Sequence, residues 1–189
     1  RTHGLKAITL NDDDELINVM ITDGTENLLI GTHGGYAVSF NADAVRSMGR
    51  SAAGVRGITL RDDDFVIGAE ILKDDASVLV ITEKGYGKQT PVDQSPIKGR
   101  GGKGIKTAQI TEKNGPLAGL AVVDGSEDIM LTTNKGVMIR FTVDSVSETG
   151  RATQGVRVIR LDDDAIVATF AKVEHEEDTP ELAEDAAET

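Results

Sequence analysis

The 189-residue sequence has no cysteine, no tryptophan and few aromatic residues, which make up 3% of the chain. Without cysteine the protein can form neither disulfides nor any cysteine-ligated zinc or iron–sulfur site, which fits a reducing cytosol. The three histidines, His3, His33 and His175, are too far apart in sequence to form a recognisable metal motif. So few aromatic rings give no support to recognition of single-stranded nucleic acid by base stacking.

Signals for membranes and for enzymes are missing as well. No apolar run reaches the roughly 18 residues of a membrane helix, and no secretory signal pattern opens the chain. There is no nucleophile elbow, P-loop, H-E-x-x-H motif or paired acid site. Residues 85–88 are too short a stretch to indicate a nucleotide loop, and Tyr36 and Tyr86 follow equivalent glycines, which favours packing over chemistry. We therefore expect no catalytic residue, no metal site and no cofactor in this chain.

The most informative feature that is present is an internal repeat. Four similar stretches, residues 4–10, 54–60, 104–110 and 155–161, begin at glycines spaced 50, 50 and 51 residues apart. Two other landmarks keep this period: a Gly-Arg pair before three of these stretches, and a glycine that ends a polar turn. These residues are Gly49, Arg50, Gly99, Arg100, Gly150, Arg151, Gly35, Gly85 and Gly136. Three landmarks with one period indicate a structural repeat.

Each unit contains about four short runs that are typical of strands. In the second unit we expect strands at 57–60, 65–72, 77–82 and 86–91, separated by turn-forming residues. In the third, residues 134–136 predict a hairpin turn into a strand at 137–142. Four strands per unit of about 50 residues predict an all-β, propeller-like array of four-stranded blades. About three and a half repeats are present, so we expect a part of a longer array, or an open arc.

Residues 174–189 differ in composition from the rest. They contain eight acidic residues and neither lysine nor arginine. We expect a blade domain over 1–173 and an acidic, disordered tail over 174–189. The tail is either a solvated terminus or a regulatory segment that competes with an anionic ligand for a basic surface.

The net charge of −12 argues at first against a nucleic-acid partner. Without the eight acids of the tail, however, the charge is −4, and residues 84–106 carry +5. The centre of this stretch, residues 98–104, reads Lys-Gly-Arg-Gly-Gly-Lys-Gly. Glycines let backbone N–H groups and neighbouring cations approach a phosphate chain closely. The alternative is a flexible connector whose glycines serve only the turn.

Cations recur at matching positions of the repeat, which would place them on one rim of a radial array. Such a belt suits a polyanion that bends around it, because phosphate contacts need no base sequence. Lys6 belongs to this series, and the predicted binding residues are Arg50, Arg56, Lys84, Lys88, Lys98, Arg100, Lys103, Lys106, Arg151 and Arg157. The alternative is that these cations pair locally with acidic loops.

Acidic triplets recur in register at residues 12–14, 62–64 and 162–164. Clustered carboxylates can bind calcium or magnesium. The third unit, however, has Glu-Lys-Asn-Gly at 112–115, which is an ordinary turn sequence. We therefore favour exposed turns over metal sites.

Residues 45–58, 85–90 and 150–156 give the chain a resemblance to the C-terminal domains of the A subunits of bacterial type II topoisomerases. The DNA gyrase A subunit is the nearer match, and its topoisomerase IV counterpart is the alternative. The resemblance implies a β-pinwheel that wraps duplex DNA around its basic rim. The wrapped crossing allows an ATP- and magnesium-dependent holoenzyme of two A and two B subunits to introduce negative supercoils. It also implies a cytoplasmic, chromosome-associated bacterial protein, with this domain alone a monomer.

One motif of that family is present only in part. The gyrase A box reads Q-R-R-G-G-K-G, and Arg100-Gly-Gly-Lys-Gly104 matches its last five positions while Lys98-Gly99 replaces the first two. We interpret this loop as the degenerate counterpart of the box in a later blade. The cleavage tyrosine and the magnesium site belong to other parts of such proteins, so we expect no strand cleavage or supercoiling by this chain alone. A propeller that binds another protein is the second hypothesis, and an independent enzyme has no support.

Overall fold

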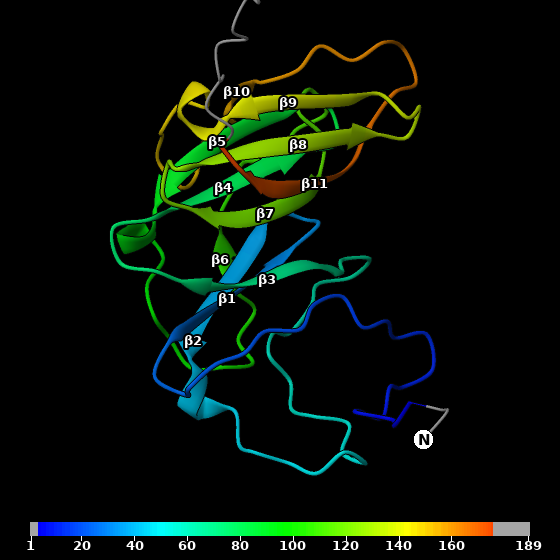
Figure 1. Cartoon of the computed structure of the whole chain (residues 1–189), viewed down its shortest axis with the longest axis vertical. Helices are drawn as coiled ribbons and strands as arrows, with labels where there is room; N and C mark the ends of the chain where they lie inside the picture. The colour runs from blue at the N-terminus through cyan, green and yellow to red at the C-terminus, as the bar shows by residue number, and fades with distance from the viewer. Residues whose placement is uncertain (1–3, 176–189) are drawn as a thin grey trace, which may run out of the picture.

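The computed structural model describes residues 4–175, which form three antiparallel β-sheets stacked along the long axis (Figure 1). The described residues contain no α-helix. The strands are β1 (Asn27–Thr32), β2 (Tyr36–Asn41), β3 (Val66–Leu72), β4 (Ser77–Thr82), β5 (Tyr86–Pro91), β6 (Ile105–Lys106), β7 (Leu117–Val123), β8 (Glu127–Thr133), β9 (Met138–Thr142), β10 (Val156–Arg157) and β11 (Val167–Glu174). The 3-10 helices η1 (Ala42–Ala44), η2 (Val92–Gln94) and η3 (Val143–Ser145) follow β2, β5 and β9 on the left-hand side of Figure 1. The all-β prediction is therefore confirmed.

The hairpins β1–β2, β4–β5 and β8–β9 have the same structure. Leu29 faces Ser39 in the first, and Leu79 faces Gln89 in the second, which is the same register 50 residues later. The turn glycines Gly35, Gly85 and Gly136 have φ of 84°, 79° and 79°, and each N–H donates to a threonine carbonyl 3.0 Å away. A side chain would be strained at that φ, which explains why glycine recurs there. The predicted hairpin at 134–136 is confirmed.

Each blade is assembled from strands of different repeats. The sheet orders are β3-β1-β2-β6, β10-β5-β4-β7 and β11-β8-β9, so β3 pairs with the hairpin before it and not with β4. The blades therefore do not coincide with the 50-residue units, and the strand expected at 57–60 is wrong, because these residues form no regular strand. An apolar run predicts a strand, but it does not predict which sheet edge that strand joins.

The core lies between the sheets. Val78 and Val80 of β4 point to one side, into a cluster with Leu29 and Leu120, while Leu79 and Ile81 point to the other side, into a cluster with residues of β8. Successive side chains of a strand face opposite sides of the sheet. The middle sheet is thus buried on both faces, which explains the uninterrupted apolar run in β4.

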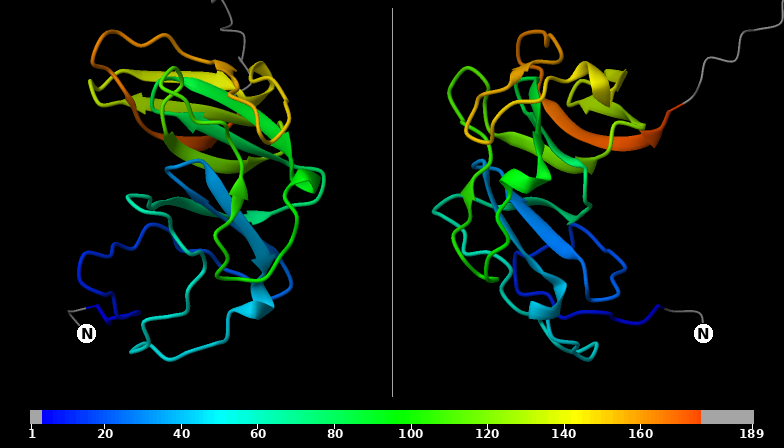
Figure 2. Two further views of the ribbon diagram at one scale, coloured as in Figure 1. Left: turned by 180° about the vertical axis from the view of Figure 1, so that it is seen from behind. Right: turned by 90° about the vertical axis from the view of Figure 1, so that its left-hand side faces the viewer.

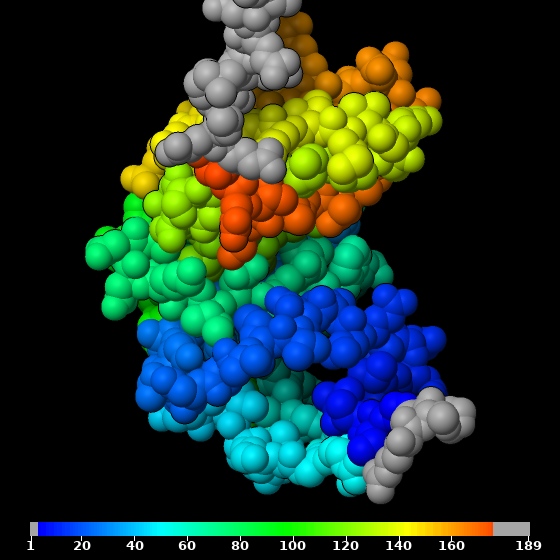
Figure 3. Space-filling view, viewed as in Figure 1, coloured from blue at the N-terminus to red at the C-terminus, as the bar shows by residue number. Residues whose placement is uncertain are grey.

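The first described segment has no strand, although the repeat predicts one. Residues 16–22 are the equivalents of β3, yet they run over the surface and Ile21 is 95% exposed (Figure 3). β3, β7 and β11 each pair with the first hairpin strand of the preceding repeat, and no hairpin precedes residues 16–22 among the described residues. The backbone groups of this segment therefore lack a partner strand.

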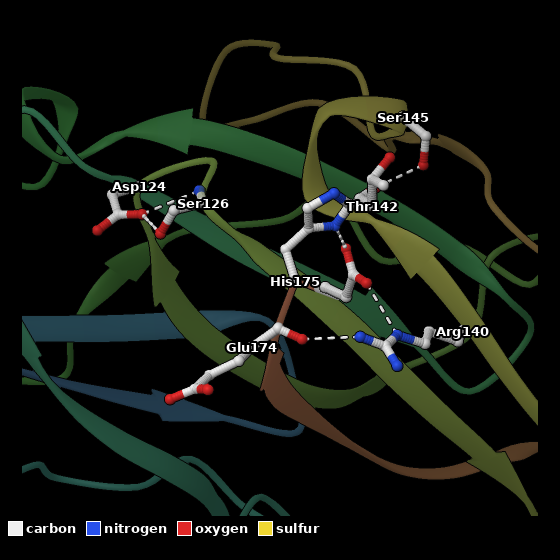
Figure 4. A network of polar contacts seen from close by, with 8 residues as sticks. Asp124, Ser126, Arg140, Thr142, Ser145, Glu174 and His175 are labelled. Carbon is white, nitrogen blue, oxygen red and sulfur yellow. Dashed lines mark hydrogen bonds and ion pairs between the residues drawn. The ribbon is translucent and has the colours of Figure 1, made fainter. Parts of the chain in front are cut away.

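At the other end, β11 is held by a polar network. Asp128, which is 5% exposed, lies 2.9 Å from His175 Nδ1 and accepts a hydrogen bond from Arg140 Nε at 2.8 Å. Arg140 also donates to the Glu174 carbonyl (Figure 4). The hydrogen bond with His175, and then that with Arg140, lowers the pKa of Asp128. The expected tail thus begins in β11, and its remainder, 176–189, lies outside the described residues.

Candidate nucleic-acid interface

Three connectors that each contain the repeated Gly-Arg pair, residues 49–53, 98–104 and 149–155, lie in long loops outside the sheets (Figure 2). Each connector packs against the glycine-initiated motif of the repeat before it, through one recurring backbone hydrogen bond. Thr9 N donates to Ala52 O at 3.1 Å, Thr59 N to Gly102 O at 2.9 Å, and Gln109 N to Thr153 O at 3.0 Å. The repeat therefore brings the cations of two successive units together at each connector.

Two of the three repeated arginines, Arg100 and Arg151, hold the connectors in place. Arg100 donates through one terminal guanidinium nitrogen to Arg56 O at 2.6 Å and through Nε to Ala44 O at 3.1 Å. One repeat later, Arg151 donates to Lys106 O at 2.6 Å. Each guanidinium thus bridges its connector to the carbonyl of a second cationic residue. Arginine serves this purpose because it has five donors and keeps its charge.

Four predicted residues have free cationic groups. Arg50, Arg56, Lys98 and Lys103 are exposed, and their side chains form no hydrogen bond or ion pair with residues 4–175. Lys98 and Lys103 flank the glycines of connector 98–104. Unpaired exposed cations beside flexible backbone are well placed to contact phosphates.

The other predicted residues are partly engaged. Lys84 donates to Glu112 O, Lys106 donates to Gln109 Oε1 at 3.0 Å, and Arg157 donates to the Tyr86 hydroxyl at 3.0 Å. Lys88 is only 1% exposed, so its prediction as a direct phosphate contact is wrong. The cause is the connector 149–155, which covers β5 at this point. Tyr86 is 6% exposed, which confirms its packing role.

Local pairing with acidic loops does not account for these cations. Within residues 4–175, the ion pairs are His33–Glu83, Arg140–Asp128, Lys172–Glu70 and His175–Asp128, and none involves a predicted binding residue. The positive charges of the connectors are therefore not neutralised by carboxylates in this part of the chain. An anionic ligand can neutralise them.

The acidic triplets form turns, as predicted. Asp13, Asp63 and Asp164 have φ of 69°, 59° and 64°, a left-handed conformation that aspartate tolerates, and Gly115 takes it in the third unit with φ of 70°. Asp64 accepts hydrogen bonds from Thr32 Oγ1 at 2.7 Å and from Gly34 N at 2.7 Å. In the described range, no three acidic or histidine side chains gather as metal ligands.

A pocket of about 210 Å³ lies under connector 98–104. Its walls are the strand residues Ala37, Val38 and Ser39 and the connector itself, including Lys98 and Lys103. Gly104 has φ of 71°, and a Cβ there would lie 2.7 Å from the Ala37 carbonyl. The close approach of connector and strand at this point therefore requires glycine.

Sequence reasoning missed Arg61. Its guanidinium lies 3.4 Å from the ring centroid of Tyr36 and donates to Lys103 O at 2.5 Å. The contact places one more cation beside connector 98–104. The selection by repeat position could not find this residue, because the equivalent residues Asn11, Thr111 and Asp162 are not basic. The only available signal was its position next to the repeated motif.

Comparison with known proteins gives consistent results. The family model described as DNA gyrase C-terminal domain, beta-propeller, matches residues 1–23, 26–73, 76–124 and 127–174. The DNA gyrase A subunit of Streptococcus pyogenes serotype M1 is 68% identical over 177 residues, which are 94% of this chain and 21% of that protein. The Staphylococcus aureus (strain MRSA252) protein of the same name is 47% identical over 189 residues, again 21% of its length. The chain thus spans about a fifth of these relatives.

Two solved structures resemble the chain in fold and in sequence. The C-terminal domain of DNA topoisomerase IV has a TM-score of 0.84 at 28% identity and covers 89% of this chain and 53% of that one. The DNA gyrase A C-terminal domain has a TM-score of 0.82 at 26% identity, with 89% and 58% covered. The model match over most of the residues and the 68% identity show that this chain belongs to the DNA gyrase C-terminal domain family, whose fold is a β-propeller.

Proposed function

We propose that this chain binds duplex DNA without sequence preference and wraps it along the connectors. The observation that carries the proposal is the set of exposed cations, Arg50, Arg56, Lys98 and Lys103, that have no acidic partner in residues 4–175. The positions of Arg50 and Arg56 carry cations again in the next two repeats, at Arg100, Lys106, Arg151 and Arg157, whereas Lys98 and Lys103 belong to connector 98–104 alone. A duplex that follows them meets a new group of positive charges at each blade, which offsets the cost of bending it.

In the whole protein, we propose that the wrapped DNA serves negative supercoiling by a gyrase holoenzyme. That holoenzyme has two A and two B subunits, acts in the bacterial cytoplasm, and carries the ATP and magnesium sites and the cleavage tyrosine outside this chain. The gyrase assignment rests on the 68% identity to proteins named as the DNA gyrase A subunit, since the solved gyrase A and topoisomerase IV domains are similarly distant, at 26% and 28% identity. No helix in residues 4–175 is long and apolar enough to cross a membrane.

The test is the salt dependence of binding to a mixed-sequence duplex of about 40 bp. Binding through phosphates releases counterions, so the logarithm of the affinity falls linearly with the logarithm of the salt concentration. Reversing both Lys98 and Lys103 to Glu is expected to weaken binding about tenfold or more at low salt, and to reduce the salt slope by about two. Affinity is expected to be similar for unrelated sequences.

The matched control reverses Lys73 and Lys135 to Glu. Both are exposed and lie outside the connectors, and the variant has the same net charge as the first. A loss of affinity confined to the connector variant supports the proposal. Equal losses in both variants, or wild-type binding that does not respond to salt, would contradict it.

A further inference from the structure

Lys88 is a buried lysine whose side chain contacts connector 149–155 from the side of the sheet. It lies in β5 and is 1% exposed, and its Nζ donates to Gly150 O at 2.8 Å and to Arg151 O at 2.5 Å. Gly155, with φ of 76°, brings the connector close to the strand, since a Cβ there would lie 2.6 Å from Gly87 O. The ammonium is therefore enclosed between β5 and connector 149–155.

The preceding blade shows that the core does not need a lysine here. Val38 is the equivalent of Lys88 one repeat earlier, and the pocket of about 210 Å³ lies beside it, under connector 98–104. In the second blade, Lys88 occupies this position and its ammonium contacts connector 149–155. An apolar side chain could pack there at less cost, because a buried charge loses its hydration. Burial, and then the nearby charge of Arg151, lower the pKa of Lys88 to about 8.

The two hydrogen bonds fix the orientation of the connector backbone. The described chain has no cis peptide, so each N–H points away from the carbonyl of its own peptide group. With the Arg151 carbonyl turned inward to Lys88, the N–H of Ala152 is turned outward. Ala152 is exposed, and its N–H has no acceptor among residues 4–175. Arg151 keeps guanidinium donors beyond the one that it gives to Lys106 O.

We propose that Lys88 is a positioning residue for phosphate binding by connector 149–155. It turns two carbonyls inward, and it thereby offers the Ala152 N–H and the Arg151 guanidinium to one phosphate of the bound duplex. The ligand is the phosphodiester backbone, because a backbone N–H and a guanidinium side by side suit an anionic oxygen. This inference rests on the proposed function and adds a residue that never touches DNA.

The experiment exploits the absence of cysteine from the chain. Lys88→Cys introduces a single thiol, which is alkylated in the unfolded full chain before refolding. An aminoethyl group rebuilds a lysine analogue with its ammonium, and a propyl group of nearly the same size restores the volume without the charge. Circular dichroism and thermal unfolding of both products establish that they fold. Affinity for the mixed-sequence duplex of about 40 bp is then measured at low salt.

We expect the aminoethyl product to bind like the wild type and the propyl product to bind about five- to tenfold more weakly, since hydrogen bonds to a charged group are lost. Faster amide exchange at Thr153, whose N–H donates to Gly150 O at 3.3 Å, in the propyl product would locate the change in the connector. Equal affinity of the two folded products would overturn the inference while leaving the proposed function intact. Failure of the wild type to bind in a salt-dependent way would overturn the proposed function itself.

Discussion

His33 and Glu83 occupy the same position in consecutive repeats, and their side chains contact each other, with Nε2 3.0 Å from Oε1. His33 also stacks on Phe65, with ring centroids 4.4 Å apart. The hairpin turn of the first blade therefore contacts the hairpin turn of the second through this pair of side chains. Asn134 holds the equivalent position in the third blade and hydrogen-bonds to Asp164 O and Ile166 N instead. The residues at this repeat position thus make different contacts in the three blades: His33 stacks on Phe65, Glu83 contacts His33, and Asn134 hydrogen-bonds to the backbone.

We predict a small coupling between His33 and Glu83. Both side chains are about one quarter to one third exposed, so water competes for the contact between them. A double-mutant cycle with His33→Ala and Glu83→Ala, followed by thermal unfolding, should give a coupling of at most about 1 kcal/mol. The single change His33→Ala should cost more than Glu83→Ala, because it also removes the stack on Phe65. A larger coupling, or equal costs of the two single changes, would contradict this explanation.

The repeat supplies a matched pair of substitutions that tests blade assembly. Ile67 of β3 packs against the core, whereas its equivalent Ile17 is 51% exposed. Ile67→Ala should lower the free energy of unfolding of this chain by roughly 1–3 kcal/mol, and Ile17→Ala should change it by less than about 0.5 kcal/mol. Chemical denaturation measures both. Similar losses in the two variants would indicate that residues 16–22 are packed in solution.

Part of the fold and of the DNA interface could be predicted from the sequence, and part could not. Short apolar runs and turn glycines were sufficient to place β4, β5 and the hairpin at Gly136. The pairing of β3 with β1 was not predictable, because the same run fits either sheet edge. The basic connectors followed from the repeat of Arg100 and its equivalents. The burial of Lys88 did not, because it depends on a connector about 60 residues away in the sequence that covers it.

Substitution of Lys88 should change the pH dependence of stability. The pKa of Lys88 in the folded chain is about 8, below its ordinary value of 10.5. Between these values the unfolded chain binds more protons than the folded one, so stability contributed by this group rises with pH. Relative to Lys88→Met, the wild type should gain on the order of 1 kcal/mol per pH unit between pH 8 and 10. Parallel curves from chemical denaturation would contradict the lowered pKa.

Asp128, which contacts His175 after β11, should make the stability of the chain sensitive to acid. The hydrogen bond with His175, and then that with Arg140, lowers its pKa, so the ionised carboxylate stabilises the folded state. This contribution is fully present above the ordinary pKa of about 4, and it is lost as the pH falls through the lowered folded value. Asp128→Asn should therefore reduce the melting temperature at pH 7, and the difference should shrink as the pH falls below about 4. A difference that is constant down to pH 2 would exclude ionisation as the cause.

The acidic residues after His175 should oppose DNA binding. Residues 176–189 carry seven acids and no basic residue, whereas the connectors carry cations without acidic partners in residues 4–175. Removal of 176–189 leaves β11 and the contact of His175 with Asp128 intact. We expect the shortened chain to bind duplex DNA more tightly at low salt, with the gain diminishing as salt screens the charges. A full-length variant with these acids changed to Gln and Asn separates charge from length and should bind like the shortened chain. Unchanged affinity at low salt in both variants would show that these residues do not compete with DNA.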